Sequence, residues 1–259
     1  MKILEIKELL AQDNVNIEIL TTLATDERKN VQNLLKSYYK RQEKIKKTTL
    51  RQQELLKFER CYYQQGVKYI AGVDEAGRGP IAGPLVVASV ILPEKCDLPG
   101  VDDSKKLTAN KRELLCKAIY QQALAVDVQV ISPQVIDELN IYQATLKGMQ
   151  DSLQALVIKP EVALIDAMPL KIPEIIIESI IKGDSLSLSI AAASIVAKTT
   201  RDKLMLDLHK LYPVYGLDKH KGYPTREHVQ AVEKYGVAEF YRQSYEPIKS
   251  IVAKKGSDK

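Results

Sequence analysis

Two adjacent carboxylates, Asp74 and Glu75, directly follow the apolar run 69–73 and precede a glycine-rich turn. Carboxylates this close repel each other unless a positive charge lies between them. The turn reads Ala-Gly-Arg-Gly-Pro-Ile-Ala-Gly-Pro over residues 76–84. Backbone N–H groups freed by glycine, together with an arginine, suit a phosphate. A divalent cation beside a phosphate would indicate phosphate-ester chemistry.

Two further acids, Asp166 and Asp184, follow later apolar strand patterns. Strand ends of an α/β sheet deliver their side chains to one edge, so these carboxylates can meet Asp74 and Glu75 although they are distant in sequence. Oxygen ligands favour a hard cation such as Mg²⁺ or Mn²⁺. The sequence contains no cluster of His or Cys residues of the kind that binds zinc. The four acids together predict a metal site.

Each acid also has a purely structural interpretation. Asp184 could cap the helix that follows it, and Asp166 could lie in a turn before Ala-Met-Pro. Neighbours on a regular strand face opposite ways, so Asp74 and Glu75 reach one site only if their strand ends there. The glycines of the turn indicate that it does.

Two loops carry side chains suited to nucleic acid. Ser104, Lys105 and Lys106 offer a hydroxyl and two cations, a composition common at phosphate contacts. Tyr223, between Gly and Pro in a basic loop, could stack on a base or a sugar. The alternatives are a capped helix start with solvated lysines and a turn tyrosine packed on its own domain.

Alternating strand and helix patterns from Gly66 onward would position these residues. The early strands follow one another quickly, which favours antiparallel pairing, and the later ones alternate with helices as in βαβ units. The prediction is an α/β fold with a mixed sheet flanked by helices. Strands are predicted at 68–74, 84–92, 124–131, 161–166 and 173–178, and helices at 108–122, 133–157, 187–211 and 225–236.

Residues 1–66 are predicted to form a small helical N-terminal module, and residues 67–259 the second domain. The first glycine is Gly66, and apolar residues before it recur at helical spacing. Between Lys36 and Arg60 there are nine basic and three acidic residues, a net charge of +6 against +5 for the whole chain. This stretch is either a solvated helix face or an arm that contacts nucleic acid.

The bulk composition is that of a globular protein. The chain has 259 residues and three cysteines without metal-ligand spacing, which favours a reduced, cytoplasmic compartment. Its N-terminus is too charged for a signal core, and no apolar run approaches the roughly 18 residues of a membrane span. We expect a monomer with no membrane contact.

Seven short motifs in this order resemble those of bacterial ribonuclease HII, the type 2 ribonuclease H, from about residue 68 to residue 248. They are Gly-Val-Asp-Glu-Ala-Gly-Arg-Gly-Pro from 72, Asp-Ser-Lys-Lys-Leu from 103, Leu-Ile-Asp-Ala from 164, Lys-Gly-Asp-Ser from 182, Ala-Ala-Ala-Ser-Ile-Val-Ala-Lys from 191, His-Lys-Gly-Tyr-Pro-Thr from 220 and Arg-Gln-Ser-Tyr-Glu-Pro from 242.

The resemblance implies an RNase H-like fold with a C-terminal helical portion. It implies endonucleolytic cleavage of the RNA strand of RNA–DNA hybrids and incision 5′ of single ribonucleotides in duplex DNA, leaving 5′-phosphate and 3′-hydroxyl ends. Two ions, Mg²⁺ or Mn²⁺, would activate a water and stabilise the leaving oxygen. Matched position by position, the metal-binding acids would be Asp74, Glu75, Asp166 and Asp184.

The same resemblance assigns the substrate contacts. Gly77, Arg78 and Gly79 would grip the backbone at the ribonucleotide and sense its 2′-OH. The loop of Ser104, Lys105 and Lys106 would hold phosphates, and Tyr223 would stack at the RNA–DNA junction.

Other functions are weighed against this one. A hybrid-only, ribonuclease HIII-like nuclease is the nearest alternative, but that family has a different pattern after its Asp-Glu pair. A non-catalytic nucleic-acid-binding protein would not need all four acids. The Gly-Arg-Gly turn argues against a third alternative, a Holliday-junction or proofreading nuclease. Residues 1–66 lie outside the resemblance, and we hypothesise that they raise affinity for duplex through phosphate contacts.

Overall fold

The computed structural model describes residues 1–257 and divides them into two compact units. The first unit is Met1–Glu54, and the second begins at Leu55. The expected boundary at residue 66 stays a prediction. No helix in the described range is both long and apolar enough to cross a membrane.

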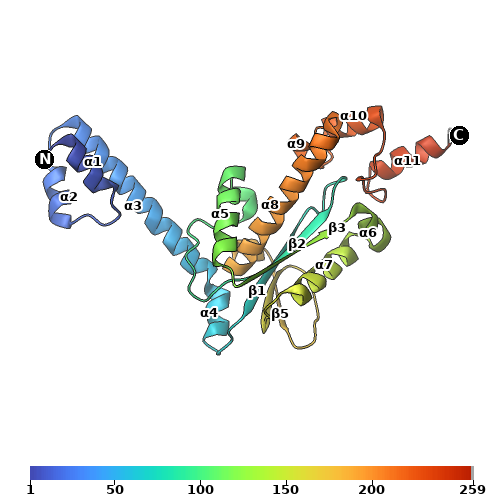
Figure 1. The fold of residues 1–259 in the computed structure, drawn as a ribbon, viewed down its shortest axis with the longest axis horizontal. Helices are drawn as coiled ribbons and strands as arrows, with labels where there is room; N and C mark the ends of the chain where they lie inside the picture. Colours follow the sequence, from blue (N-terminus) through green and yellow to red (C-terminus); the bar gives the residue numbers. More distant parts are fainter. Residues whose placement is uncertain (258–259) are drawn as a thin grey trace. The chain divides into compact units, whose positions relative to one another are not determined.

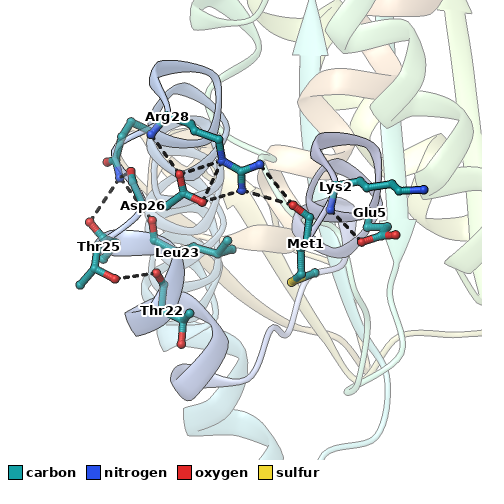
Figure 2. A network of polar contacts seen from close by, with 10 residues as sticks. Met1, Lys2, Glu5, Thr22, Leu23, Thr25, Asp26 and Arg28 are labelled. Carbon is teal, nitrogen blue, oxygen red and sulfur yellow. Dashed lines mark hydrogen bonds and ion pairs between the residues drawn. The ribbon is translucent and has the colours of Figure 1, made fainter.

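The first unit is helical. It contains α1 (Ile3–Ala11), α2 (Ile17–Ala24) and most of α3 (Lys29–Leu55). Its core is made by one apolar face of each helix, namely Ile6, Leu10, Leu23, Val31, Leu35 and Tyr38. Figure 2 shows Arg28 bound to the Asp26 carboxylate, 2.6 Å from Nη2 to Oδ2, and to the Met1 carbonyl. The Arg28 hydrogen bonds lower the pKa of Asp26 to about 2.

The second unit is built on a mixed five-stranded sheet in the order β3-β2-β1-β4-β5 (Figure 1). The β1–β2 and β2–β3 pairs are antiparallel, whereas β1–β4 and β4–β5 are parallel. This arrangement confirms the predicted fold class. The strands are β1 (Ile70–Ala76), β2 (Leu85–Ile91), β3 (Ala125–Ile131), β4 (Val162–Asp166) and β5 (Ile176–Ile180).

Helices cover both faces of the sheet (Figure 1). One face packs against α5 (Ala109–Gln122) and α8 (Leu188–Leu211), and the other against α6 (Pro133–Leu139) and α7 (Ile141–Ala155). At Gly72 the backbones of β1 and α8 nearly touch, since a Cβ there would lie 1.9 Å from the Ser189 carbonyl carbon. Glycine in the strand therefore lets α8 lie directly beside Asp74.

A short helix before the sheet, α4 (Lys57–Tyr63), belongs to this second unit. Phe58, Tyr62 and Tyr63 pack against the apolar side chains of β1, β4 and β5. The Tyr62 hydroxyl also donates to Glu178 Oε2 on β5 at 2.7 Å. The elements after α8 are the 3₁₀ turn Pro213–Tyr215, α9 (Leu217–His220), α10 (Arg226–Tyr235) and α11 (Ile248–Ser257).

Three predicted elements differ from the observed ones by more than one residue. The single helix expected at 133–157 is two helices, because Asn140 has φ 65° and its side chain caps α7. The strand expected at 173–178 begins at Ile176. The strand expected to end at Asp74 continues to Ala76, because β2 still pairs with it there, whereas pairing with β4 stops at Val73.

Candidate active site

The acidic residues lie at the edge of the sheet where the pairing between β1 and β4 ends. Asp74 is beyond the last β1–β4 pair, and Asp166 is the last residue of β4. Alternate strand residues face opposite sides, so Asp74 faces α8, where it is hydrogen-bonded to Ser194, and Glu75 faces away. Glu75 contacts Arg78 instead, at 3.5 Å between Oε1 and Nη1. Asp74 and Glu75 therefore lie on opposite sides of β1, just beyond the end of its parallel pairing with β4.

Burial and mutual repulsion act on these carboxylates. Burial and the charge of Glu75 raise the pKa of Asp74 well above its usual range. Burial also raises the pKa of Glu75, against the opposing charge of Arg78. Burial raises the pKa of Asp166, which accepts a hydrogen bond from the Gly183 N–H at 2.7 Å. Carboxylates that destabilise one another in this way are suited to a shared cation.

One oxygen at this edge has no hydrogen-bond donor. Glu75 Oε2 is buried and has no partner within residues 1–257. Over the same range, no three His, Cys, Asp or Glu side chains are gathered closely enough to hold a metal by themselves. The residues nevertheless fit Mg²⁺ or Mn²⁺ chemically, because such ions use few protein carboxylates and complete their coordination with water and phosphate oxygens.

Asp184 joins the same edge through the short 3₁₀ turn Gly183–Ser185. It is only 6% exposed, and its Oδ2 lies 3.4 Å from Lys105 Nζ. The cap of α8 is Ser187, whose hydroxyl accepts from the Ile190 N–H. Asp184 is thus not the helix cap that one interpretation of the sequence allowed.

A groove of about 440 Å³ opens beside the carboxylates. It brings together seven residues singled out in the sequence: Glu75, Gly77, Arg78, Gly79, Ser104, Lys105 and Tyr223. Asp74, Asp166, Asp184 and Lys106 do not line it. Lys106 lies 3.8 Å from Asp102, and its side chain is 59% exposed.

Two buried arginines hold the turn between β1 and β2 by its carbonyl oxygens. Arg201 donates to the carbonyls of Pro84 and Ala82 as well as that of Lys221. Arg242 donates to those of Gly77, Arg78 and Gly83. The N–H groups of Arg78 and Gly79 have no acceptor within the described chain. The turn therefore keeps donors available at the groove.

Tyr223 is placed next to that turn. A Cβ on Gly79 would lie 3.6 Å from Tyr223 Cε1, and the tyrosine is 45% exposed. His228 fixes its backbone, with 2.9 Å between His228 Nδ1 and the Tyr223 carbonyl oxygen. The ring is thus presented to the groove from an anchored loop.

Four groove residues were given no role from the sequence: Arg112 and Arg201, and also Ser194 and Lys198, which lie in the motif that begins at residue 191. Arg112 and Lys198 both pair with Asp202, at 3.1 Å and 2.6 Å. Ser194 belongs to the small-residue helix and meets Ser104 in a buried hydroxyl contact of 2.9 Å. The contacts of Ser194 and Arg112 depend on the tertiary fold, because Ser104 and Asp202, their respective partners, are each 90 positions away in sequence.

Comparison with known proteins identifies relatives across the whole chain. A model of ribonuclease HII matches residues 71–247, and one of the ribonuclease HII N-terminal domain matches residues 2–63. The ribonuclease HII of Bacillus cytotoxicus is 48% identical over 252 residues, covering 96% of this chain and 95% of that protein.

Solved structures show the same fold. Ribonuclease H2 of Pyrococcus horikoshii OT3 is 30% identical, with a TM-score of 0.63, 72% of this chain covered and 98% of that one. Bst-RNase HIII in complex with Mn²⁺ is 18% identical, with a TM-score of 0.52, 74% of this chain covered and 71% of that one. The second likeness concerns the fold alone.

The sheet topology and these relatives define the class, which is that of the ribonuclease H hydrolases, enzymes acting on RNA–DNA hybrids. The resemblance seen in the short motifs is confirmed over nearly the full length. The chain belongs to the ribonuclease HII family.

Proposed function

We propose that this chain is an endonuclease that cleaves the RNA strand of RNA–DNA hybrids and incises 5′ of single ribonucleotides in duplex DNA. The products would carry 5′-phosphate and 3′-hydroxyl ends. The observation that carries the proposal is the repulsion between carboxylates at one edge of the sheet, where burial and the charges of Glu75 and Asp166 raise the pKa of Asp74, beside a groove that contains Arg78 and Gly79.

The acids would hold Mg²⁺ or Mn²⁺ in a two-ion arrangement. Asp74 and Glu75 lie just beyond the last β1–β4 pair, Asp166 ends β4, and Asp184 lies in the 3₁₀ turn before α8. When bound, such ions lower the pKa of a water and neutralise charge on the leaving oxygen. Lys105, beside Asp184, adds a positive charge at the mouth of the groove.

The substrate contacts follow from the turn between β1 and β2. The N–H groups of Arg78 and Gly79 are donors for a phosphate or a 2′-OH, and Arg201 and Arg242 hold the turn from behind. The exposed ring of Tyr223 can stack on a sugar or base next to Gly79. Ser104 is buried against Ser194, so we assign it to positioning Lys105.

The test is cleavage of an end-labelled DNA duplex with one ribonucleotide, in Mg²⁺ or Mn²⁺, by wild type and Asp74→Asn. We expect incision 5′ of the ribonucleotide by the wild type and a loss of at least about 100-fold in the variant, the scale of a lost electrostatic catalytic group. Asp127→Asn, on the edge strand β3, removes a carboxylate away from the groove and should leave activity unchanged.

The same assay separates the alternative. Cleavage of a long RNA–DNA hybrid, with the single-ribonucleotide duplex left intact, would indicate a hybrid-only activity and contradict the role given to Gly77, Arg78 and Gly79.

A further inference from the structure

Glu59, on α4, is a buried carboxylate that contacts the start of α8. It is 1% exposed, and its Oε1 accepts from the Ser187 hydroxyl at 2.6 Å and from the Ser189 N–H at 2.9 Å. A negative charge at the N-terminus of a helix is stabilised by the helix dipole and by free N–H groups. The contact therefore fixes how α8 begins.

The hydrogen bonds continue from Glu59 into the acidic edge. The Ser187 N–H donates to the Gly183 carbonyl at 2.9 Å, and the Gly183 N–H donates to Asp166 Oδ1 at 2.7 Å. Asp184 is the next residue of the same turn. A displacement of Ser187 would thus reach both Asp166 and Asp184.

The carboxylate is costly to keep in this place. Burial raises the pKa of Glu59, and its Oε2 has no hydrogen-bond partner within residues 1–257. An apolar side chain would fill the volume without that cost, but it could not accept from two donors at once. Holding Ser187 and Ser189 is the function that the contacts of Glu59 support.

We propose that Glu59 is a positioning residue of the active site, which holds the Gly183–Ser185 turn so that Asp184 and Asp166 face the same cation. The inference rests on the proposed role of these two aspartates as metal ligands. It also gives α4, which lies within the match to the N-terminal domain model, a direct part in the catalytic unit.

The test compares Glu59→Ala with Glu59→Gln and Tyr62→Phe in the full chain. Glutamine keeps an oxygen that accepts from both donors. Tyr62→Phe removes another hydrogen bond of α4, the one to Glu178, without touching the start of α8. Two quantities are measured on each protein: Mn²⁺ affinity by calorimetry, and amide hydrogen exchange of residues 181–190 without metal.

We expect Glu59→Ala to weaken Mn²⁺ binding by roughly tenfold, the lower end of what outer-shell partners of metal ligands contribute. Exchange of residues 181–190 should be faster in this variant. Glu59→Gln should stay within about twofold of wild type, and Tyr62→Phe should lower only the melting temperature.

Wild-type Mn²⁺ affinity in Glu59→Ala would overturn the inference, as would equal weakening in Tyr62→Phe. Asp184→Asn separates this failure from that of the proposed function, because wild-type affinity in that variant refutes the ligand assignment itself. If Glu59→Ala does not fold, Ser187→Ala removes one of the two donors to Glu59 together with the cap of α8, and wild-type Mn²⁺ affinity in that variant would overturn the inference.

Discussion

At the scale of single residues, Gly77 is where backbone conformation and packing coincide. Its φ is +100°, and a Cβ would lie 2.1 Å from Arg201 Nε. A side chain here is therefore excluded twice, by its own backbone and by the arginine that holds the turn. Glycine at position 77 is therefore needed for the shape of the turn.

Gly77→Ala should lower stability by about 1–3 kcal/mol from backbone strain alone and raise KM further by displacing Arg201. Gly66→Ala is the matched control, because Gly66 also has a positive φ, +86°, but has no atom within 4 Å of the added Cβ. Chemical unfolding and cleavage kinetics of both variants measure the difference. Equal KM values in the two variants would contradict the collision with Arg201.

His228 should make the protein sensitive to acid. It is fully buried between the Tyr223 carbonyl and the Tyr241 hydroxyl, and burial lowers its pKa to about 4. The unfolded chain binds this proton near pH 6.5, so stability is full above that pH and is lost between about pH 6.5 and 4.

The expected loss is about 2 kcal/mol between pH 6.5 and 5, from 1.36 kcal/mol per pKa unit. Urea unfolding at the two pH values measures it. In His228→Phe the pH slope should become smaller whatever the stability of the variant at neutral pH. An unchanged slope would assign the acid sensitivity to other groups.

The sequence alone identifies the acidic residues but not what surrounds them. Asp74, Glu75, Asp166 and Asp184 stand out because acids after apolar runs are unusual. Arg242 and Ser194 lie within two of the short motifs, but the sequence does not reveal their contacts with the turn and with Ser104, because these depend on the tertiary fold. The metal and substrate roles of these residues stay predictions.

At the scale of elements, the hydrophobic periodicity of the sequence was sufficient to predict the strands of the sheet and the helices that flank it, in their order along the chain. The sheet, its mixed pairing and the long helix α8 follow the predicted pattern. The bounds of β1 could not be predicted, because the strand is prolonged by β2 alone after β4 has ended. The break between α6 and α7 likewise depends on the positive φ of Asn140, which the spacing of apolar residues does not predict.

The helix α3 carries a stripe of exposed lysines that suits a phosphate backbone. Lys36, Lys40, Lys44 and Lys47 are exposed and three or four positions apart, so they share one face. The apolar residues Val31, Leu35 and Tyr38 are buried on another. This arrangement sharpens the hypothesis that the first unit adds affinity for duplex.

Lys40→Ala combined with Lys44→Ala should raise KM for hybrid duplex and flatten its salt dependence. Each lost phosphate contact lowers the slope of log K against log salt by about 0.9. Lys117→Ala with Lys147→Ala removes the same charge from lysines that pair with neighbouring acids. Equal slopes for the two double variants would refute the hypothesis. Point substitutions are preferable to deleting residues 1–65, because that deletion would also remove α4.

At the scale of the whole molecule, the catalytic unit depends on contacts between distant parts of the chain. β1 pairs with β4, and α8 packs over both. Arg242 lies far from β1 in sequence, yet its guanidinium holds three carbonyls of the turn after β1.

Arg242→Met should therefore act on stability and on substrate binding together. Leaving buried carbonyls unsatisfied costs about 1–3 kcal/mol each, so the variant should lose at least about 3 kcal/mol. Arg226→Met, at an exposed position of α10, serves as the control and should be neutral. A stable Arg242→Met protein with wild-type KM would show that the turn does not need this anchor.

The position of Arg242 in the sequence means that its contact with the turn can form only late in synthesis. A chain emerging from the ribosome folds from its N-terminus, and contacts distant in sequence form last. The turn after β1 is made early, but the arginine that secures it follows only at position 242. A chain released before that position would contain all four acids, but its turn would lack the hydrogen bonds that Arg242 donates to three carbonyls.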